Sequence, residues 1–178
     1  MLEFNVVKNK HGYNYVIILE KYYNPSISIL IDTGSLYPVW TSDESAFLDL
    51  FPDARLANNL TCMLGGFGNG TESCKIYILP KFILSDGKES IIYHNLPVVM
   101  QKKNFSFDMI ISSTMLNKMN YKYVSHTRDK KEINPVFRIY NLKQDYYAGI
   151  HKVTLQPNTN ICINTHYVLS NVYTFTHE

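Results

Sequence analysis

Short apolar runs separated by Gly, Pro, Asn and Asp follow one another along most of the chain. Such runs are typical of β-strands bounded by turns. Leu2, Phe4 and Val6 alternate with polar positions, and the run "SISILI" leads directly into Asp32. Further strand-like runs are "NLTCM", "CKIYIL", "VFRIY", "GIHKVTL", "NICIN" and "YVLSNVYTF". The pattern predicts a mostly β protein.

Two segments are expected to form short helices. The segment "TSDESAFLDLF" has the capping-box spacing between Thr41 and Glu44, and it stops at Pro52. The segment "SSTMLNKMN" follows the apolar run "FDMII" and is expected to form the second helix.

Composition narrows the class of protein. The chain has 178 residues, of which 46% are hydrophobic and 18% charged, and these values predict one globular domain. The net charge is +2, and the basic residues are scattered among acids, so no nucleic-acid or membrane partner is expected.

Targeting and metal-binding signals are also missing from the sequence. No apolar run approaches the ~20 residues of a membrane helix, and the first residues lack a signal-peptide layout, so a cytoplasmic protein is expected. The three cysteines and six histidines lack ligand spacing, so neither a metal nor a cofactor is expected.

The segment "ILIDTGSLYPVW" carries the candidate chemistry. Asp32 follows an apolar strand and precedes small residues, of which Gly34 permits a tight turn. This arrangement places a carboxylate at the tip of a strand. A plain turn aspartate is the alternative interpretation.

In these residues the chain resembles the aspartic proteases, specifically the retropepsin-like branch, which has one DTG triplet per chain. The resemblance implies a mostly β, retropepsin-like acid-protease barrel with one or two short helices over residues 1–120. Residues 121–178 would then be a β-rich C-terminal extension, belonging either to the same domain or to a dimer interface.

Two later segments extend the resemblance in the family's order. The glycine-rich "LGGFGNG" lies between two strand-like runs and resembles the flap that closes over bound peptide; a plain hairpin loop is the alternative. The expected flap residues are Leu64, Gly65, Gly66, Phe67 and Gly68.

The segment "FDMIISSTMLNKMN" resembles a late segment of the family, and there Ile110 and Ile111 are expected to line the substrate pocket. Met115 and Leu116 would form the apolar face of the following helix. Ser112 departs from the family, because a glycine is usual at its position.

The resemblance implies a homodimer, because this chemistry needs two carboxylates and the chain offers one DTG. Asp32 from each chain would meet across a two-fold axis and share one proton. One carboxylate would activate a water as general base while the protonated one polarises the scissile carbonyl. Thr33, Gly34 and Ser35 would support the loop.

The Ser35 hydroxyl is expected to hydrogen-bond the Asp32 carboxylate, which predicts an acidic activity optimum. The sequence therefore favours an aspartic endopeptidase acting on peptide or protein substrates. The alternative is a catalytically silent fold of the same kind that binds peptide or serves as an assembly module.

Two other features yield structural expectations. Asp108 is expected to end a strand or cap a turn and not to act as a second catalytic acid. If the glycine-rich hairpin turns symmetrically about Gly68, Cys62 and Cys74 lie directly opposite each other. A cross-strand disulfide is then a hypothesis, although a reducing cytosol opposes it.

Overall fold

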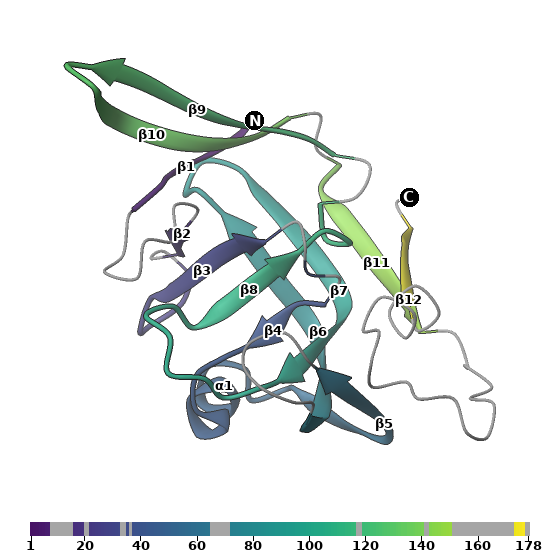
Figure 1. Cartoon of the computed structure of the whole chain (residues 1–178). Helices are drawn as coiled ribbons and strands as arrows, with labels where there is room; N and C mark the ends of the chain where they lie inside the picture. The colour runs from purple at the N-terminus through teal and green to yellow at the C-terminus, as the bar shows by residue number, and fades with distance from the viewer. Residues whose placement is uncertain are drawn as a thin grey trace.

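The computed structural model describes residues 1–7, 16–19, 22–32, 35, 37–64, 72–116, 119–140, 143–150 and 173–176. These residues form a mostly β structure, as predicted, and contain one short helix where two were expected (Figure 1). The strands are β1 (Leu2–Asn5), β2 (Val16–Leu19), β3 (Ile27–Asp32), β4 (Val39–Trp40), β5 (Arg55–Leu64), β6 (Glu72–Ser85), β7 (Ser90–Met100), β8 (Met109–Ser112), β9 (Asn120–Arg128), β10 (Lys131–Tyr140), β11 (Asp145–Ile150) and β12 (Tyr173–Thr176); helix α1 spans Glu44–Leu50.

The larger sheet has the strand order β12-β11-β7-β4-β8-β3-β2; in addition, β6 pairs with β7, and β5 pairs with β6. Strand β8 lies between β3 and β4, parallel to the first and antiparallel to the second. The pairings among the described strands leave edges at β2, β5 and β12, so these strands do not close the barrel that was expected.

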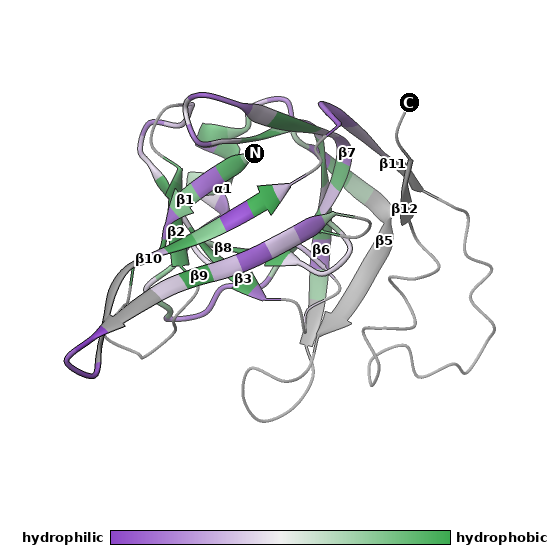
Figure 2. Cartoon of the chain, turned by 90° about the horizontal axis from the view of Figure 1, so that it is seen from above, coloured by the Kyte–Doolittle hydropathy of each residue, from purple (hydrophilic) through white to green (hydrophobic). Residues whose placement is uncertain are grey.

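The smaller sheet has the order β1-β10-β9 and joins the first strand to the C-terminal extension. Strand β1 pairs with β10 from Leu2, opposite Ile139, to Asn5. The hairpin of β9 and β10 projects from the body, and Figure 2 shows that the turn at its far end is polar.

The described part of the extension shares one core with the preceding residues. Phe137, Ile139 and Tyr146 are buried in the same apolar cluster as Leu2 and Phe4. The alternation of Leu2, Phe4 and Val6 predicted this burial, because alternate residues of a strand face the same side.

Helix α1 packs its aromatic side chains into the core. The Phe47 ring lies 5.4 Å from Trp40 and 5.0 Å from Phe51, measured between ring centroids. The helix ends before Pro52, as predicted, but the expected capping box is wrong: the N-cap residue is Asp43. The Thr41 hydroxyl donates instead to the Phe107 carbonyl, at 2.9 Å.

The second predicted helix is replaced by turns in the described residues 113–116. The Leu116 N–H donates to the Ser113 carbonyl at 3.2 Å, which is the bonding of a tight turn and not of an α-helix. Met115 and Leu116, expected to form the apolar face of that helix, are buried within these turns instead.

Candidate active site

Asp32 lies where a buried strand reaches the surface. Strand β3 runs between β2 and β8, and Ile29 and Ile31 on it belong to the core. Asp32 ends this strand, is partly exposed, and lies beside Ser112 in the parallel register of β3 and β8. Figure 1 shows these two strands side by side and pointing the same way. The structure thus brings the DTG segment and the late segment together at one edge of the sheet, 80 residues apart in sequence.

Ile110 and Ile111 contact the core and not a pocket. Both side chains have 0% exposure, because β8 is flanked by β3 and β4 in the interior of the sheet. In a single chain neither side chain presents surface to a substrate. The prediction that these two residues line the substrate pocket is therefore corrected. They form the buried support beneath the end of β3.

Ser35 ties the loop after Asp32 to β8. The Ser35 N–H donates to the Asp32 carbonyl at 3.1 Å, and the Ser113 N–H donates to the Ser35 carbonyl at 2.7 Å. The Ser35 hydroxyl donates to the Tyr37 carbonyl at 2.9 Å. Since a hydroxyl has one proton, this bond replaces the expected donation to the Asp32 carboxylate. Thr33 and Gly34 lie outside the described residues.

Asp108 clamps β3, β8 and the residues before α1. One carboxylate oxygen accepts from the Ser28 N–H at 3.0 Å and from the Ser28 hydroxyl at 3.2 Å. The other oxygen accepts from the Ser42 hydroxyl at 2.8 Å. The Asp108 N–H also donates to the Ser28 carbonyl at 2.9 Å. Asp108 thus links separate segments through its carboxylate, and it lies just before β8 and not, as was expected, at the end of a strand.

The clamp fixes the register of the strand that ends at Asp32. Ser28 lies near the start of β3, and Asp32 ends the same strand four residues later. Neither Ser28 nor Ser42 was singled out by the sequence, because each meets Asp108 across more than 60 residues of chain. No local pattern marks such a contact.

The glycine-rich segment lies in sequence between the two strands of a hairpin. Strands β5 and β6 pair antiparallel, and Leu64 lies opposite Glu72 at their ends. Cys62 lies opposite Cys74, so the register expected from a turn centred on Gly68 is confirmed. Gly65, Gly66, Phe67 and Gly68 lie outside the described residues.

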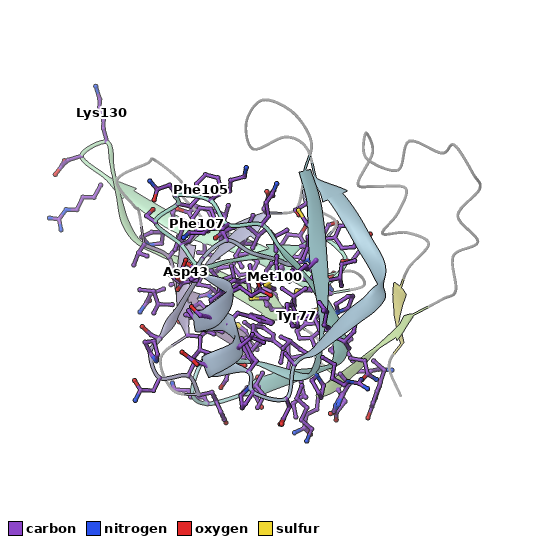
Figure 3. All side chains as sticks on the ribbon, turned by 90° about the horizontal axis from the view of Figure 1, so that it is seen from below. Asp43, Tyr77, Met100, Phe105, Phe107 and Lys130 are labelled. Atoms are coloured by element: carbon purple, nitrogen blue, oxygen red, sulfur yellow. The ribbon has the colours of Figure 1, made fainter. Side chains whose placement is uncertain are left out.

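The β6 strand of this hairpin is attached to α1 through Glu44. The Tyr77 hydroxyl and the Lys75 ammonium both donate to the Glu44 carboxylate. The hydrogen bond from Tyr77, followed by that from Lys75, lowers the pKa of Glu44, and the same bond raises the pKa of Tyr77 to about 12. Figure 3 shows Tyr77 between the helix and the hairpin, consistent with its ring lying 5.6 Å from that of Phe47.

A contact between a carboxylate and an imidazole lies on other strands. His94 on β7 contacts Asp145 on β11 at 2.7 Å, and its ring stacks on Tyr147 with 4.4 Å between centroids. This contact attaches β11 to β7, where the two strands pair in parallel over only three residues. We therefore assign it to the packing of the extension.

Other kinds of site find no support in the described part of the chain. It contains no group of three His, Cys, Asp or Glu side chains placed to hold a metal ion. Within the same residues, no helix has the length and apolar character needed to span a membrane. The chain matches no protein-family model, no curated protein and no solved structure with which it was compared.

Proposed function

We propose that the protein is an aspartic endopeptidase that acts as a homodimer. The observation that carries this proposal is the position of Asp32: a partly exposed carboxylate at the end of a buried strand, beside the end of β8. The hairpin of β5 and β6, with its glycine-rich connection, supplies the second element that a peptide-binding cleft of this kind requires.

Two copies would complete the site. A residue near a two-fold axis becomes a pair, so one Asp32 from each chain supplies both acids. Two carboxylates in close contact retain one proton between them. The ionised member takes a proton from the bound water as it attacks the scissile carbonyl, and the protonated member donates to the carbonyl oxygen.

The substrate would bind as an extended strand. Peptides in this conformation are held by main-chain hydrogen bonds to neighbouring backbone, with alternate side chains in pockets. Residues 64–70 would cover the peptide from one side and the ends of β3 and β8 would support it from the other. The pocket walls must come from residues other than Ile110 and Ile111, which are buried.

The donation of the Ser35 hydroxyl to Tyr37 changes the reason for an acidic optimum. The optimum no longer depends on a hydroxyl that stabilises the carboxylate. It depends on the shared proton, which must remain on the pair during the attack. We therefore still expect faster cleavage below neutral pH.

The test is cleavage of a diverse peptide library between about pH 3.5 and 7.5, analysed by mass spectrometry. Asp32→Asn retains the size of the side chain and removes the ionisable acid, so it should abolish every cut. Asp49→Asn, an exposed aspartate on α1, is the matched control and should cut at the same bonds as the wild type. Equal cleavage by wild type and Asp32→Asn would refute the proposal.

A catalytically silent peptide-binding or assembly module is the second candidate. It is favoured by the hydrogen bond of the Ser35 hydroxyl to Tyr37, which leaves that donor away from the acid. A wild-type sample that is dimeric and cleaves nothing across the pH range would identify this candidate. A protein that remains monomeric at all concentrations would also favour it.

A further inference from the structure

Within the described residues, strand β5 is paired along one edge. Among the described strands it pairs with β6 alone, whereas β6 also pairs with β7 from Ile76 to Ser85. Strand β6 is further attached to α1 by the bonds from Lys75 and Tyr77 to Glu44. The position of β5 therefore depends on its register against β6.

That register changes along the hairpin. Near the base, Arg55 lies opposite Ile78 and Leu56 opposite Tyr77. Continuing the same register would place residue 61 opposite residue 72, but Thr61 lies opposite Lys75. The chain between Leu56 and Thr61 absorbs this offset of three residues. The outer half of the hairpin therefore has a different register from its base.

The outer register is the one that places two cysteines opposite each other. In it Cys62 faces Cys74, whereas the base register would place Cys62 opposite Thr71. Directly opposed residues of an antiparallel pair have Cα atoms about 4.5 or 5.5 Å apart, according to their position in the ladder. Both spacings fall within the roughly 4.4–6.8 Å that a disulfide spans.

We propose that Cys62 and Cys74 form a disulfide site that fixes the outer register of the β5–β6 hairpin. The partner reagent is a small-molecule disulfide of the glutathione class. One cysteine thiolate attacks it and releases one glutathione thiol. The second cysteine thiolate then attacks the protein sulfur of the mixed disulfide and releases the other. Two protein thiols are oxidised, one disulfide reagent is reduced, and the thiol protons pass to the two released glutathiones.

The bond closes a ring from Cys62 to Cys74 that contains the glycine-rich segment. A cross-link around a ring of this size reduces the open conformations of the chain roughly a hundred-fold. The side chain of Cys74 is buried, with 3% exposure, so the bond adds no exposed sulfur on that strand. An effect on peptide access rests on the proposed function; the cross-link itself does not.

The test begins with the full chain and needs no activity. The protein is incubated with glutathione disulfide or with a phosphine reductant, alkylated, and analysed by intact mass and peptide mapping. Oxidation should remove two alkylation sites and yield one peptide pair that joins Cys62 to Cys74. Cys162→Ser is the matched control and should cross-link as fully as the wild type. Three alkylatable thiols after oxidation, or a pair that includes Cys162, would overturn the proposal.

Amide hydrogen exchange tests the structural consequence. Exchange in residues 61–64 and in the facing residues of β6 should slow roughly a hundred-fold on oxidation of the wild type. It should be unaffected by oxidation in Cys62→Ser, which also reports whether that variant retains the hairpin. Equal exchange in oxidised and reduced wild type would show that the bond does not hold the register.

Peptide cleavage by the oxidised and reduced wild type separates this inference from the proposed function. A confirmed cross-link in a protein that cleaves no peptide would support the disulfide site and refute the proposed endopeptidase activity. If the protein forms no cross-link but cleaves peptides in a way that depends on Asp32, the endopeptidase proposal is supported and the disulfide site is refuted.

Discussion

The β3–β8 pair and the β5–β6 hairpin carry the two parts of the proposed site, and they are built in contrasting ways. Strand β3 has neighbours on both sides, and its register is fixed by the bonds between Asp108 and Ser28. Strand β5 has one neighbour among the described strands, a change of register, and an exposed Leu56. A catalytic carboxylate needs a fixed position, whereas a covering hairpin needs to move.

The two parts of the proposed site are therefore expected to contribute unequally to the stability of the fold. Substitutions beneath Asp32 should cost much of the free energy of unfolding, which is about 5–15 kcal/mol for a typical domain. Substitutions on the β5 edge should cost little. Paired variants of the two regions can test this contrast.

Ile111→Ala should lower the free energy of unfolding by about 3 kcal/mol, because it leaves a cavity at a fully buried position of β8. Leu56→Ala on β5, where the side chain is 43% exposed, should change it by less than about 0.5 kcal/mol. Urea denaturation of the two variants measures both. Similar losses in the two variants would remove the contrast between the strands.

Asp108→Ala should lower the free energy of unfolding by about 2 kcal/mol, because it leaves the Ser28 N–H and two serine hydroxyls without their acceptor. Asp49→Ala, on the exposed side of α1, is the control and should cost less than about 0.5 kcal/mol. Both values come from the same denaturation experiment. An Asp108→Ala protein as stable as this control would show that the clamp does not fix β3.

Tyr23→Phe should cost about 1 kcal/mol, because the Tyr23 hydroxyl both accepts from the Ile83 N–H and donates to the Ile83 carbonyl on β6. Burial raises the pKa of Tyr23 to about 12, above its ordinary value of 10.0. A raised pKa means that the neutral hydroxyl stabilises the fold below pH 10 and that this contribution is lost as the pH rises to about 12. Denaturation at several alkaline pH values should therefore show that the free energy of unfolding falls less steeply with pH in Tyr23→Phe than in the wild type.

Glu44→Gln should have the smallest effect, about 0.5 kcal/mol, because the carboxylate is partly exposed to solvent. Its pKa is lowered in the folded chain, so its contribution is present above the unfolded pKa and is lost as the pH falls through the folded one. The difference in free energy of unfolding between the wild type and Glu44→Gln should therefore disappear in acid. A double-mutant cycle with Tyr77→Phe measures the part due to that one hydrogen bond.

Local patterns predicted those features of the fold that depend on neighbouring residues. The alternation at Leu2, Phe4 and Val6, the end of α1 before Pro52, and the hairpin register at Cys62 and Cys74 all follow from short stretches of sequence. Periodicity and turn residues are sufficient for such features because each is decided within a few residues.

The features that were predicted wrongly depend on distant partners. Thr41 has the spacing of a cap, but its hydroxyl donates to Phe107, 66 residues away. Ile110 and Ile111 have the apolar character of either a pocket wall or a core strand, and only the pairing of β8 with β3 and β4 decides between them. Likewise, the sequence of neither strand alone predicts the parallel pairing that brings Ser112 beside Asp32.

The central claim is that the active site contains one Asp32 from each of two chains, and subunit mixing tests it most directly. Wild type and Asp32→Asn are mixed in varying ratios at constant total protein concentration, allowed to exchange subunits, and assayed for peptide cleavage. If both carboxylates are needed, the rate should follow the square of the wild-type fraction and fall to about a quarter in an equal mixture. A rate that falls in simple proportion to the wild-type fraction would place a complete site in each chain and contradict the account.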